Sequence, residues 1–265
     1  MKIIYSIKNN KIKKLLKIQK SSKERRKKKI FSIEGIKEIN MAHKAKYYIL
    51  EFFICPFLFN KNKKKLFKLN NKKVNIINLK VFEKISYRKN KDGIIAIAKN
   101  KNKELLNYNE NIIIFNEVEK PGNLGASFRS IEASGIKNVI LNNIKTDCFH
   151  PNIIRSSIGT VFTLKININN NYKEIIKNLK KKKYKILLAV TKKNKINKNL
   201  YKIKFSNKIA IVIGGEHSGI SKYWINNLYL EKFFIPMFGK IDSLNLSNAT
   251  SIILFEIMRQ KYYNF

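Results

Sequence analysis

The chain contains very little cysteine. Cys55 and Cys148 are the only two cysteines in 265 residues, and neither has a closely spaced partner. A disulfide framework is therefore excluded as the basis of the fold, because such frameworks need several paired cysteines. A reducing compartment is expected, and we predict a cytoplasmic protein.

Histidines and long apolar runs are also scarce. His43, His150 and His217 lack the spacing of metal ligands, so no metal site is expected. The longest apolar run, Phe52–Phe59, contains Pro56 and is shorter than the roughly 18 residues that span a membrane. The basic N-terminus has no continuous apolar stretch and no small-residue cleavage site, so neither a signal peptide nor a membrane span is predicted.

Acidic residues are few. There are 17 of them against 56 lysines and arginines, which gives a formal net charge of +39. Such a charge favours a polyanionic partner such as RNA or DNA. Arginine occupies six positions, which leaves 50 lysines, and Lys, Asn and Ile are abundant together, as in coding sequence rich in A and T. Part of the charge is therefore compositional drift, and it only supports nucleic-acid binding.

The length and the 44% hydrophobic content favour two domains, each with its own core. Residues 1–19 are predicted to be a basic extension with one weak helical face. Residues 20–98 are predicted to be a small α/β domain with strands near 30–33, 47–55, 74–79 and 94–98 and helices near 34–44 and 80–87. The polar stretch 99–111 is predicted to be a linker.

Strands and helices alternate in the remaining residues, 112–265, which are predicted to form one domain. Strands are expected at 112–115, 138–141, 161–165, 186–190 and 209–213, and helices at 124–134, 172–182 and 246–261. This alternation predicts an α/β fold with a mostly parallel, doubly wound sheet. In such sheets, ligands bind at the carboxyl ends of the strands.

The first segment with chemical potential is 116–135. A turn with two glycines leads into a helix, where Asn123 is a plausible N-cap. Arg129 lies six residues further on, and Glu132 follows at a spacing that allows an ion pair to orient the guanidinium. Taken alone, this pattern also describes a capped helix with a surface ion pair.

Two later segments have the same character. Gly214–Gly219, GGEHSG, follows an apolar strand but matches neither the dinucleotide fingerprint nor a phosphate loop. Ile235–Met237, IPM, ends another short strand and is followed by SLNLS at Ser243–Ser247, which opens a helix. A glycine loop and an N-cap explain each segment separately, so only their joint order carries information about function.

In this order and spacing, the segments resemble the SpoU/TrmH family of RNA ribose 2′-O-methyltransferases, which belongs to the SPOUT class. The residues that match are NLGASFR at Asn123–Arg129, GGE at Gly214–Glu216 with Gly219, and IPM followed by SLNLS. The resemblance covers about residues 111–260. Arg25–Ile39, RRKKKIFSIEGIKEI, resembles more loosely the RNA substrate-binding domain, of ribosomal-protein type, that some members carry.

The resemblance implies a trefoil-knotted C-terminal domain that binds S-adenosyl-L-methionine. It assigns the cofactor to Thr191, Gly214, Gly215, Ile235, Met237 and Leu244. It assigns catalysis to Arg129, with Asn123, Glu216, Ser243 and Asn245 orienting that arginine and the ribose. RNA contacts are expected from Arg25, Arg26 and Arg155.

Family members use the arginine on the reacting ribose. A guanidinium carries a fixed positive charge, so we favour a role for Arg129 in positioning the 2′-hydroxyl and stabilising the developing oxyanion. The other role, general base, stays open at this point. Lys120 stands where the family usually has Asp, and Gly215 and His217 also depart from the usual residues.

The resemblance also implies a homodimer and an RNA substrate. We expect 23S rRNA, because residues 20–98 are longer and richer in strands than the short flanking helices of members that act on tRNA. The alternatives are a tRNA 2′-O-methyltransferase and, in a different class, a non-catalytic RNA-binding or ribosome-assembly protein that kept the fold.

Overall fold

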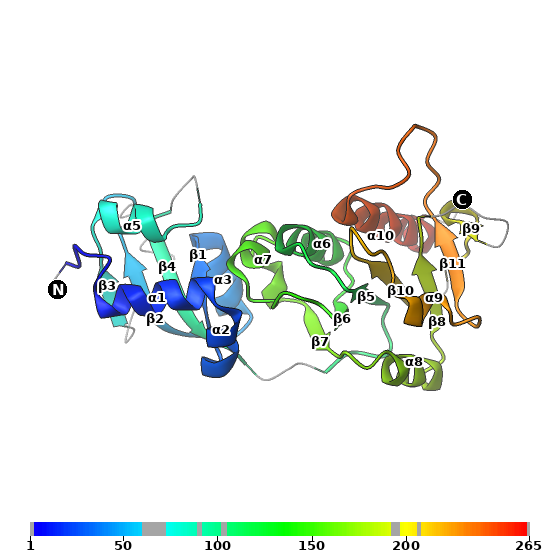
Figure 1. Ribbon diagram of the computed structural model, residues 1–265, viewed down its shortest axis with the longest axis horizontal. Coiled ribbons are helices and arrows are strands. Elements are labelled where there is room, and N and C mark those ends of the chain that lie inside the picture. The colour runs from blue at the N-terminus through cyan, green and yellow to red at the C-terminus, as the bar shows by residue number, and fades with distance from the viewer. Residues whose placement is uncertain are drawn as a thin grey trace. The chain divides into compact units, whose positions relative to one another are not determined.

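The chain divides into two compact units. The computed structural model describes residues 3–59, 73–88, 92–101, 105–191, 197–205 and 208–263. Unit 1 comprises Met1–Asn102 and Asp147–Thr163, and unit 2 comprises Lys103–Thr146 and Leu164–Phe265 (Figure 1). The predicted domain 112–265 is therefore interrupted, because its segment Asp147–Thr163 belongs to unit 1. Within the described residues, no helix is long and apolar enough to cross a bilayer.

Unit 1 is built on a four-stranded sheet in the order β1-β4-β2-β3. The strands are β1 (Ile30–Glu34), β2 (Tyr48–Ile54), β3 (Lys73–Ile76) and β4 (Ile94–Lys99). β4 pairs antiparallel with β1 and β2, and β3 pairs parallel with β2. All four lie where β-branched and aromatic runs predict strands.

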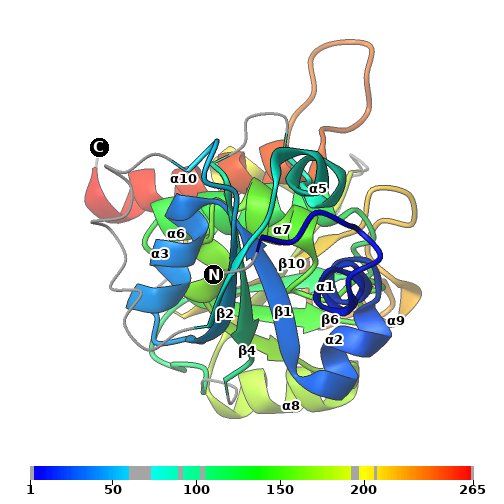
Figure 2. The same ribbon diagram turned by 90° about the vertical axis from the view of Figure 1, so that its left-hand side faces the viewer.

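Two helices, α1 (Asn10–Lys20) and α5 (Leu79–Ile85), cover one face of this sheet (Figure 2). Ile12, Leu15 and Ile18 of α1 are fully buried in a cluster that includes Phe53 of β2. The prediction of residues 1–19 as an extension is therefore wrong for α1. Its few apolar residues recur at helical spacing, so they form one stripe that packs as core despite the lysines between them.

The other face of the sheet carries α3 (Ile36–Lys44) (Figure 2). The segment Asp147–Thr163, which belongs to unit 1, adds α7 (Pro151–Ser156) and the 3₁₀ helix η1 (Thr160–Phe162). Phe149 of this segment stacks on Phe31 of β1 with ring centroids 4.2 Å apart, and Phe162 lies 5.7 Å from the same ring. These aromatic contacts make the segment part of the unit 1 core.

The prediction of a strand at 161–165 is wrong for all but its last residue. Gly159 has a φ of 82°, η1 follows it, and the strand begins only at Lys165. Val161 and Phe162 are buried as expected of strand residues, but they are buried in a helical turn. Short apolar runs do not distinguish these two environments.

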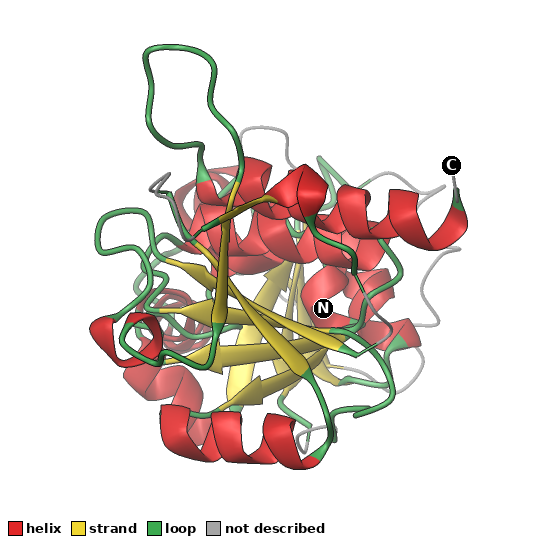
Figure 3. Cartoon of the chain, turned by 90° about the vertical axis from the view of Figure 1, so that its right-hand side faces the viewer, coloured by secondary structure: helices red, strands yellow, loops and turns green. Residues whose placement is uncertain are grey.

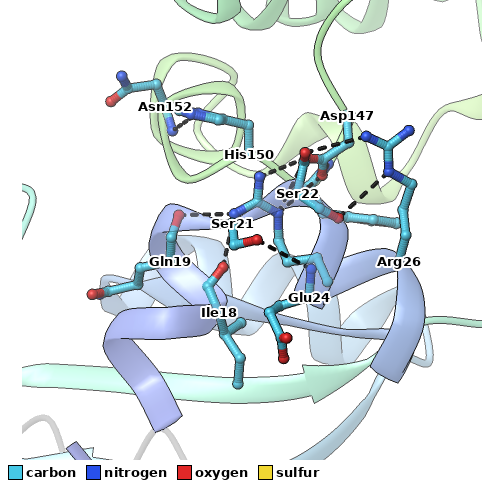
Figure 4. A network of polar contacts seen from close by, with 11 residues as sticks. Ile18, Gln19, Ser21, Ser22, Glu24, Arg26, Asp147, His150 and Asn152 are labelled. Atoms are coloured by element: carbon cyan, nitrogen blue, oxygen red, sulfur yellow. Dashed lines mark hydrogen bonds and ion pairs between the residues drawn. The ribbon is translucent and has the colours of Figure 1, made fainter. Parts of the chain in front are cut away.

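Arg25 lies in α2 (Ser22–Lys28) and was expected to contact RNA. Its side chain is 3% exposed and forms an ion pair with Asp147 at 2.5 Å. The same guanidinium donates hydrogen bonds to the carbonyl oxygens of Ile18 and Gln19 at 2.7 and 2.8 Å (Figure 4). Arg25 is therefore a buried structural residue, because its guanidinium donates to Asp147, Ile18 and Gln19, which all belong to unit 1.

Breaking this pair is expected to destabilise the protein strongly. Arg25→Met leaves the Asp147 carboxylate, which is 12% exposed, without its partner, and removal of one member of a buried pair typically costs about 3–5 kcal/mol. Arg26→Met is the matched control, because the neighbouring Arg26 is exposed and, among the described residues, its side chain bonds only to Ser22. Urea denaturation measures both variants, and equal stability losses would contradict the prediction.

Unit 2 contains a seven-stranded, fully parallel sheet in the order β7-β6-β5-β10-β8-β11-β9. Its strands are β5 (Ile112–Asn116), β6 (Asn138–Asn142), β7 (Lys165–Ile168), β8 (Lys185–Ala189), β9 (Lys198–Asn199), β10 (Ile209–Gly214) and β11 (Glu231–Phe234). The α/β class with a parallel sheet is confirmed. The trefoil knot stays a prediction.

Helices cover both faces of this sheet (Figure 3). They are α6 (Pro121–Ala133), α8 (Tyr172–Lys181), α9 (Lys222–Ile225) and α10 (Leu246–Tyr262), with a 3₁₀ turn η2 (Leu200–Lys202). α6 and α10 pack together through a hydrogen bond between Ser130 and Ser251 at 2.7 Å. Small hydroxyl residues on both helices permit this close approach, which brings the first and third motifs side by side.

Candidate active site

The glycine motif forms a tight loop after β10. Gly215 and Gly219 exchange two backbone hydrogen bonds of 3.1 and 3.0 Å, and Gly219 has a φ of 63°. A Cβ on Gly214 would lie 2.1 Å from the Gly219 carbonyl carbon, and one on Gly215 would lie 2.5 Å from the Glu117 oxygen. The loop therefore needs glycine at both positions, because backbone occupies the space of a side chain.

A cavity of about 580 Å³ opens beside this loop. All six residues expected to bind a cofactor line it: Thr191, Gly214, Gly215, Ile235, Met237 and Leu244. Glu216, Ser243 and Asn245 of the expected catalytic set line it as well. The cavity lies at the carboxyl ends of β8, β10 and β11, where parallel sheets place their ligands.

A hydrogen-bond network joins the three motifs. The Asn123 amide nitrogen donates to the Glu216 carboxylate, and the Asn245 amide nitrogen donates to the Asn123 carbonyl oxygen at 3.3 Å. The second Glu216 oxygen is buried without a partner among the described residues. Asn123 thus contacts Glu216 and Asn245, which lie more than ninety positions further along the chain. The second Glu216 oxygen could accept a hydrogen bond from a ligand.

One of these residues also caps a helix, and one does not cap the helix that the sequence predicted. Asn245 is the N-cap of α10, and its side-chain oxygen accepts from the Ser247 backbone nitrogen at 2.9 Å. Asn123 is not the cap of α6, as the sequence suggested, because the helix already begins at Pro121 and Lys120 is the cap residue. Its side chain is thereby free to bond Glu216, which suits a role in the site better than a role in the helix.

Arg129 lies on an exposed part of α6 and does not line the cavity. Among the described residues, no hydrogen bond or ion pair holds its guanidinium, so the expected pairing with Glu132 is wrong. Ser243 is exposed at the cavity, and its hydroxyl donates to Asp242 at 3.1 Å. It lies in the loop between β11 and α10, which projects from the sheet (Figure 1).

The sequence reading missed two buried asparagines. Asn116 ends β5 and Asn142 ends β6, and their side chains are joined by a hydrogen bond of 2.9 Å. Asn116 accepts from the Ser221 backbone nitrogen at 2.7 Å, and Asn142 accepts from the Trp224 ring nitrogen at 3.0 Å. They anchor the far end of the glycine loop. Asparagine at the end of two successive apolar strands was the available signal.

Both parts of the chain match known protein families. The sequence model described as the SpoU rRNA Methylase family matches residues 110–255, more than half of the chain. The chain belongs to the SpoU rRNA Methylase family. Residues 9–96 match the model described as the MRM3-like substrate binding domain, so the N-terminal part of this SpoU protein resembles a module that other proteins use for their substrates.

Individual proteins with similar sequences are named as RNA methyltransferases. An uncharacterised tRNA/rRNA methyltransferase of Borreliella burgdorferi is 33% identical over 213 residues, which cover 74% of this chain and 91% of the relative. The 23S rRNA (uridine(2479)-2′-O)-methyltransferase of Streptomyces viridochromogenes is 28% identical over 152 residues, 56% of this chain and 52% of that protein. The chain thus spans only about half of the second relative.

The fold is shared along its whole length. The crystal structure of an RNA 2′-O ribose methyltransferase superposes with a TM-score of 0.84 at 28% identity, covering 98% of this chain and 99% of that one. The two-unit organisation of this SpoU protein therefore has a close structural counterpart.

The cavity fits the cofactor that the SpoU family implies. Its volume lies in the range of about 300–1,000 Å³ typical of small-molecule sites. Ile235, Leu244 and Ile253 offer an apolar wall for a purine, while Asp242 and Glu216 offer negative charge to a cationic ligand. Across the described residues, no group of three or more His, Cys, Asp or Glu is arranged for a metal ion.

The other residues expected to bind RNA are exposed in unit 1. Within the part of the chain that the structure describes, the Arg26 side chain bonds only to Ser22 of its own helix, and Arg155 lies in the last turn of α7. Both guanidiniums are available to phosphate, unlike that of Arg25.

Proposed function

We propose that this protein is an S-adenosyl-L-methionine-dependent RNA ribose 2′-O-methyltransferase that acts on 23S rRNA in the cytoplasm. The observation that carries the proposal is the cavity at the carboxyl edge of the unit 2 sheet. It gathers the six residues that the SpoU pattern assigns to the cofactor and three that it assigns to catalysis.

The chain's own residues suggest how the site works. S-adenosyl-L-methionine, when bound, supplies a methyl group activated by a sulfonium. The backbone of Gly214 and Gly215 approaches a ligand closely because no side chain intervenes. Asn123 and Asn245 orient the Glu216 carboxylate, and the bonded network restricts its motion. This arrangement pre-organises the site, so less ordering is needed when RNA binds.

Arg129 is assigned to the ribose and its phosphate. A 2′-hydroxyl loses its proton during attack, and the oxygen gains negative charge. A guanidinium holds its protons, so Arg129 stabilises that charge and orients the hydroxyl rather than removing the proton, which passes to solvent water. Its exposure and its lack of partners among the described residues support a contact made only with bound RNA.

The choice of rRNA rests on the N-terminal part of the chain. Its match to a substrate-binding domain over residues 9–96 supports a large structured target. The Streptomyces viridochromogenes relative is named as a 23S rRNA ribose methyltransferase. The target base does not follow from the residues that line the cavity.

Transfer of a labelled methyl group tests the proposal. Purified protein is incubated with labelled S-adenosyl-L-methionine and with 23S rRNA or tRNA from cells lacking the gene. We expect label in 23S rRNA, recovered as a 2′-O-methyl nucleoside after digestion. Label confined to tRNA would identify tRNA as the substrate in place of 23S rRNA. Cofactor binding without any transfer would favour the non-catalytic RNA-binding protein.

We also propose a homodimer that uses α10. Phe255, Tyr262 and Tyr263 are 53%, 63% and 63% exposed at this helix, an unusual concentration of large apolar side chains. Phe255→Asp with Tyr262→Asp is expected to convert the dimer to a monomer, because buried charge opposes association. Light scattering at micromolar concentration measures the mass, with Tyr201→Asp as the control. A monomeric unmodified protein would contradict the proposal.

A further inference from the structure

Unit 2 has a second concave feature, which we call the tyrosine groove. It has a volume of about 690 Å³ and lies between α8 and the segment from α9 to β11. Three tyrosines and three lysines contribute to its lining: Tyr172, Tyr223, Tyr229, Lys173, Lys177 and Lys222. It shares no lining residue with the cofactor cavity, and no role in the SpoU motifs explains it.

Two of the three tyrosines are largely exposed. Tyr223 is 66% exposed and Tyr229 is 86% exposed, and the neighbouring Leu228 is 91% exposed. The Tyr172 ring stacks on Tyr223 with centroids 5.0 Å apart and an angle of 23°, which holds the pair in place. Exposed aromatic side chains that lie together on one surface are candidates for contact with a partner.

Positive charge surrounds these rings. The Lys180 ammonium lies 4.9 Å from the centroid of Tyr229, and no acidic residue is among the described residues that line the groove. Lysine is so frequent in this chain that lysines alone would carry little weight. Tyrosine occurs 12 times in 265 residues, so three in one groove is the more selective observation.

The groove is connected to the active site through the chain. The glycine loop lines the cofactor cavity and continues directly into α9, one wall of the groove. Asn116 and Asn142, the last residues of β5 and β6, hold the start of α9 through Ser221 and Trp224. The start of α9 therefore lies at the carboxyl edge of the sheet beside the glycine loop, whereas Tyr229 lies just before β11 and near the end of α8.

We propose that the tyrosine groove binds a single-stranded segment of RNA by stacking bases on Tyr223 and Tyr229, with the lysines on the phosphates. Open aromatic faces beside cations are the combination that binds single strands without base specificity. A protein partner fits less well, because the rim of lysines would need an acidic counterpart. The inference rests on the proposed function, since it treats RNA as the substrate class, but it concerns binding outside the cofactor cavity.

The test measures binding of the full chain to a fluorescent single-stranded oligouridine in about physiological salt. Tyr223→Ala with Tyr229→Ala is expected to weaken binding about tenfold or more, since each base–aromatic stack contributes substantially. The corresponding double Phe variant keeps the rings and is expected to retain affinity. Tyr201→Ala is the matched control, because Tyr201 is 55% exposed in the same unit.

A charge variant provides a second readout. Lys173→Gln with Lys222→Gln is expected to make the negative slope of log affinity against log salt shallower by about 1.4, as for two lost single-strand phosphate contacts. Lys202→Gln with Lys204→Gln is the control. Crosslinks from 4-thiouridine in the oligonucleotide are expected on the peptide that contains Tyr223 and Tyr229.

Three results would overturn the groove proposal. They are unchanged affinity of the double Ala variant, absence of crosslinks at this peptide, and a change of oligomeric state without loss of RNA binding, which would identify a protein interface. Failure of the proposed function is distinguishable, because absent methyl transfer with groove-dependent RNA binding would leave this inference standing.

Discussion

Arg129→Ala is expected to reduce methyl transfer by about a hundredfold to a thousandfold, the loss typical when a group that stabilises an oxyanion is removed. Affinity for S-adenosyl-L-methionine is expected to remain nearly unchanged. The reason is geometric. Arg129 does not line the cavity and is exposed, so the variant removes a contact to the ribose and leaves the cofactor's surroundings intact.

Two further substitutions sharpen this experiment. Arg129→Lys keeps the charge but loses the planar fork, so partial activity would indicate that charge alone contributes. Glu132→Ala is the control for disturbance of α6, because Glu132 is exposed one turn further along the same helix. Single-turnover transfer and calorimetric cofactor binding measure the two effects separately. A large loss of cofactor affinity in Arg129→Ala would refute the assigned role.

Gly214→Ala is expected to have the second large effect, on cofactor binding and stability together. Its Cβ would lie 2.1 and 2.3 Å from the carbonyl carbon and oxygen of Gly219, and backbone has little freedom to move away. Overpacking of this kind typically costs about 1–3 kcal/mol, and here it also opens the loop that lines the cavity. We expect loss of measurable cofactor binding and a lower midpoint in thermal unfolding.

Gly239→Ala is the matched control. Gly239 lies in the exposed loop before α10, and an added Cβ would meet nothing within 4 Å. The same chemical change is therefore expected to leave stability and cofactor affinity unchanged. If both glycine variants behave alike, the contact between Gly214 and Gly219 does not shape the site.

Most of the unit 2 sheet was predictable. The apolar runs of β5, β6, β8 and β10 are buried on both faces, so their residues are continuously hydrophobic and mark the strands without ambiguity. The prediction failed where the same local pattern fits two structures. Val161 and Phe162 are apolar in either a strand or a turn, and the choice depended on Gly159 and on aromatic partners distant in the chain.

The sequence by itself determined the family, the class of fold and the residues around the cofactor cavity, because the order and spacing of the motifs are visible along the chain without knowledge of its fold. The tertiary structure decided the placement of charged and polar side chains. It buried Arg25 against Asp147, released Asn123 from helix capping to bond Glu216, and gathered three tyrosines into a groove. Such contacts join residues far apart in sequence, and their free energies depend on burial and partners that no local pattern records.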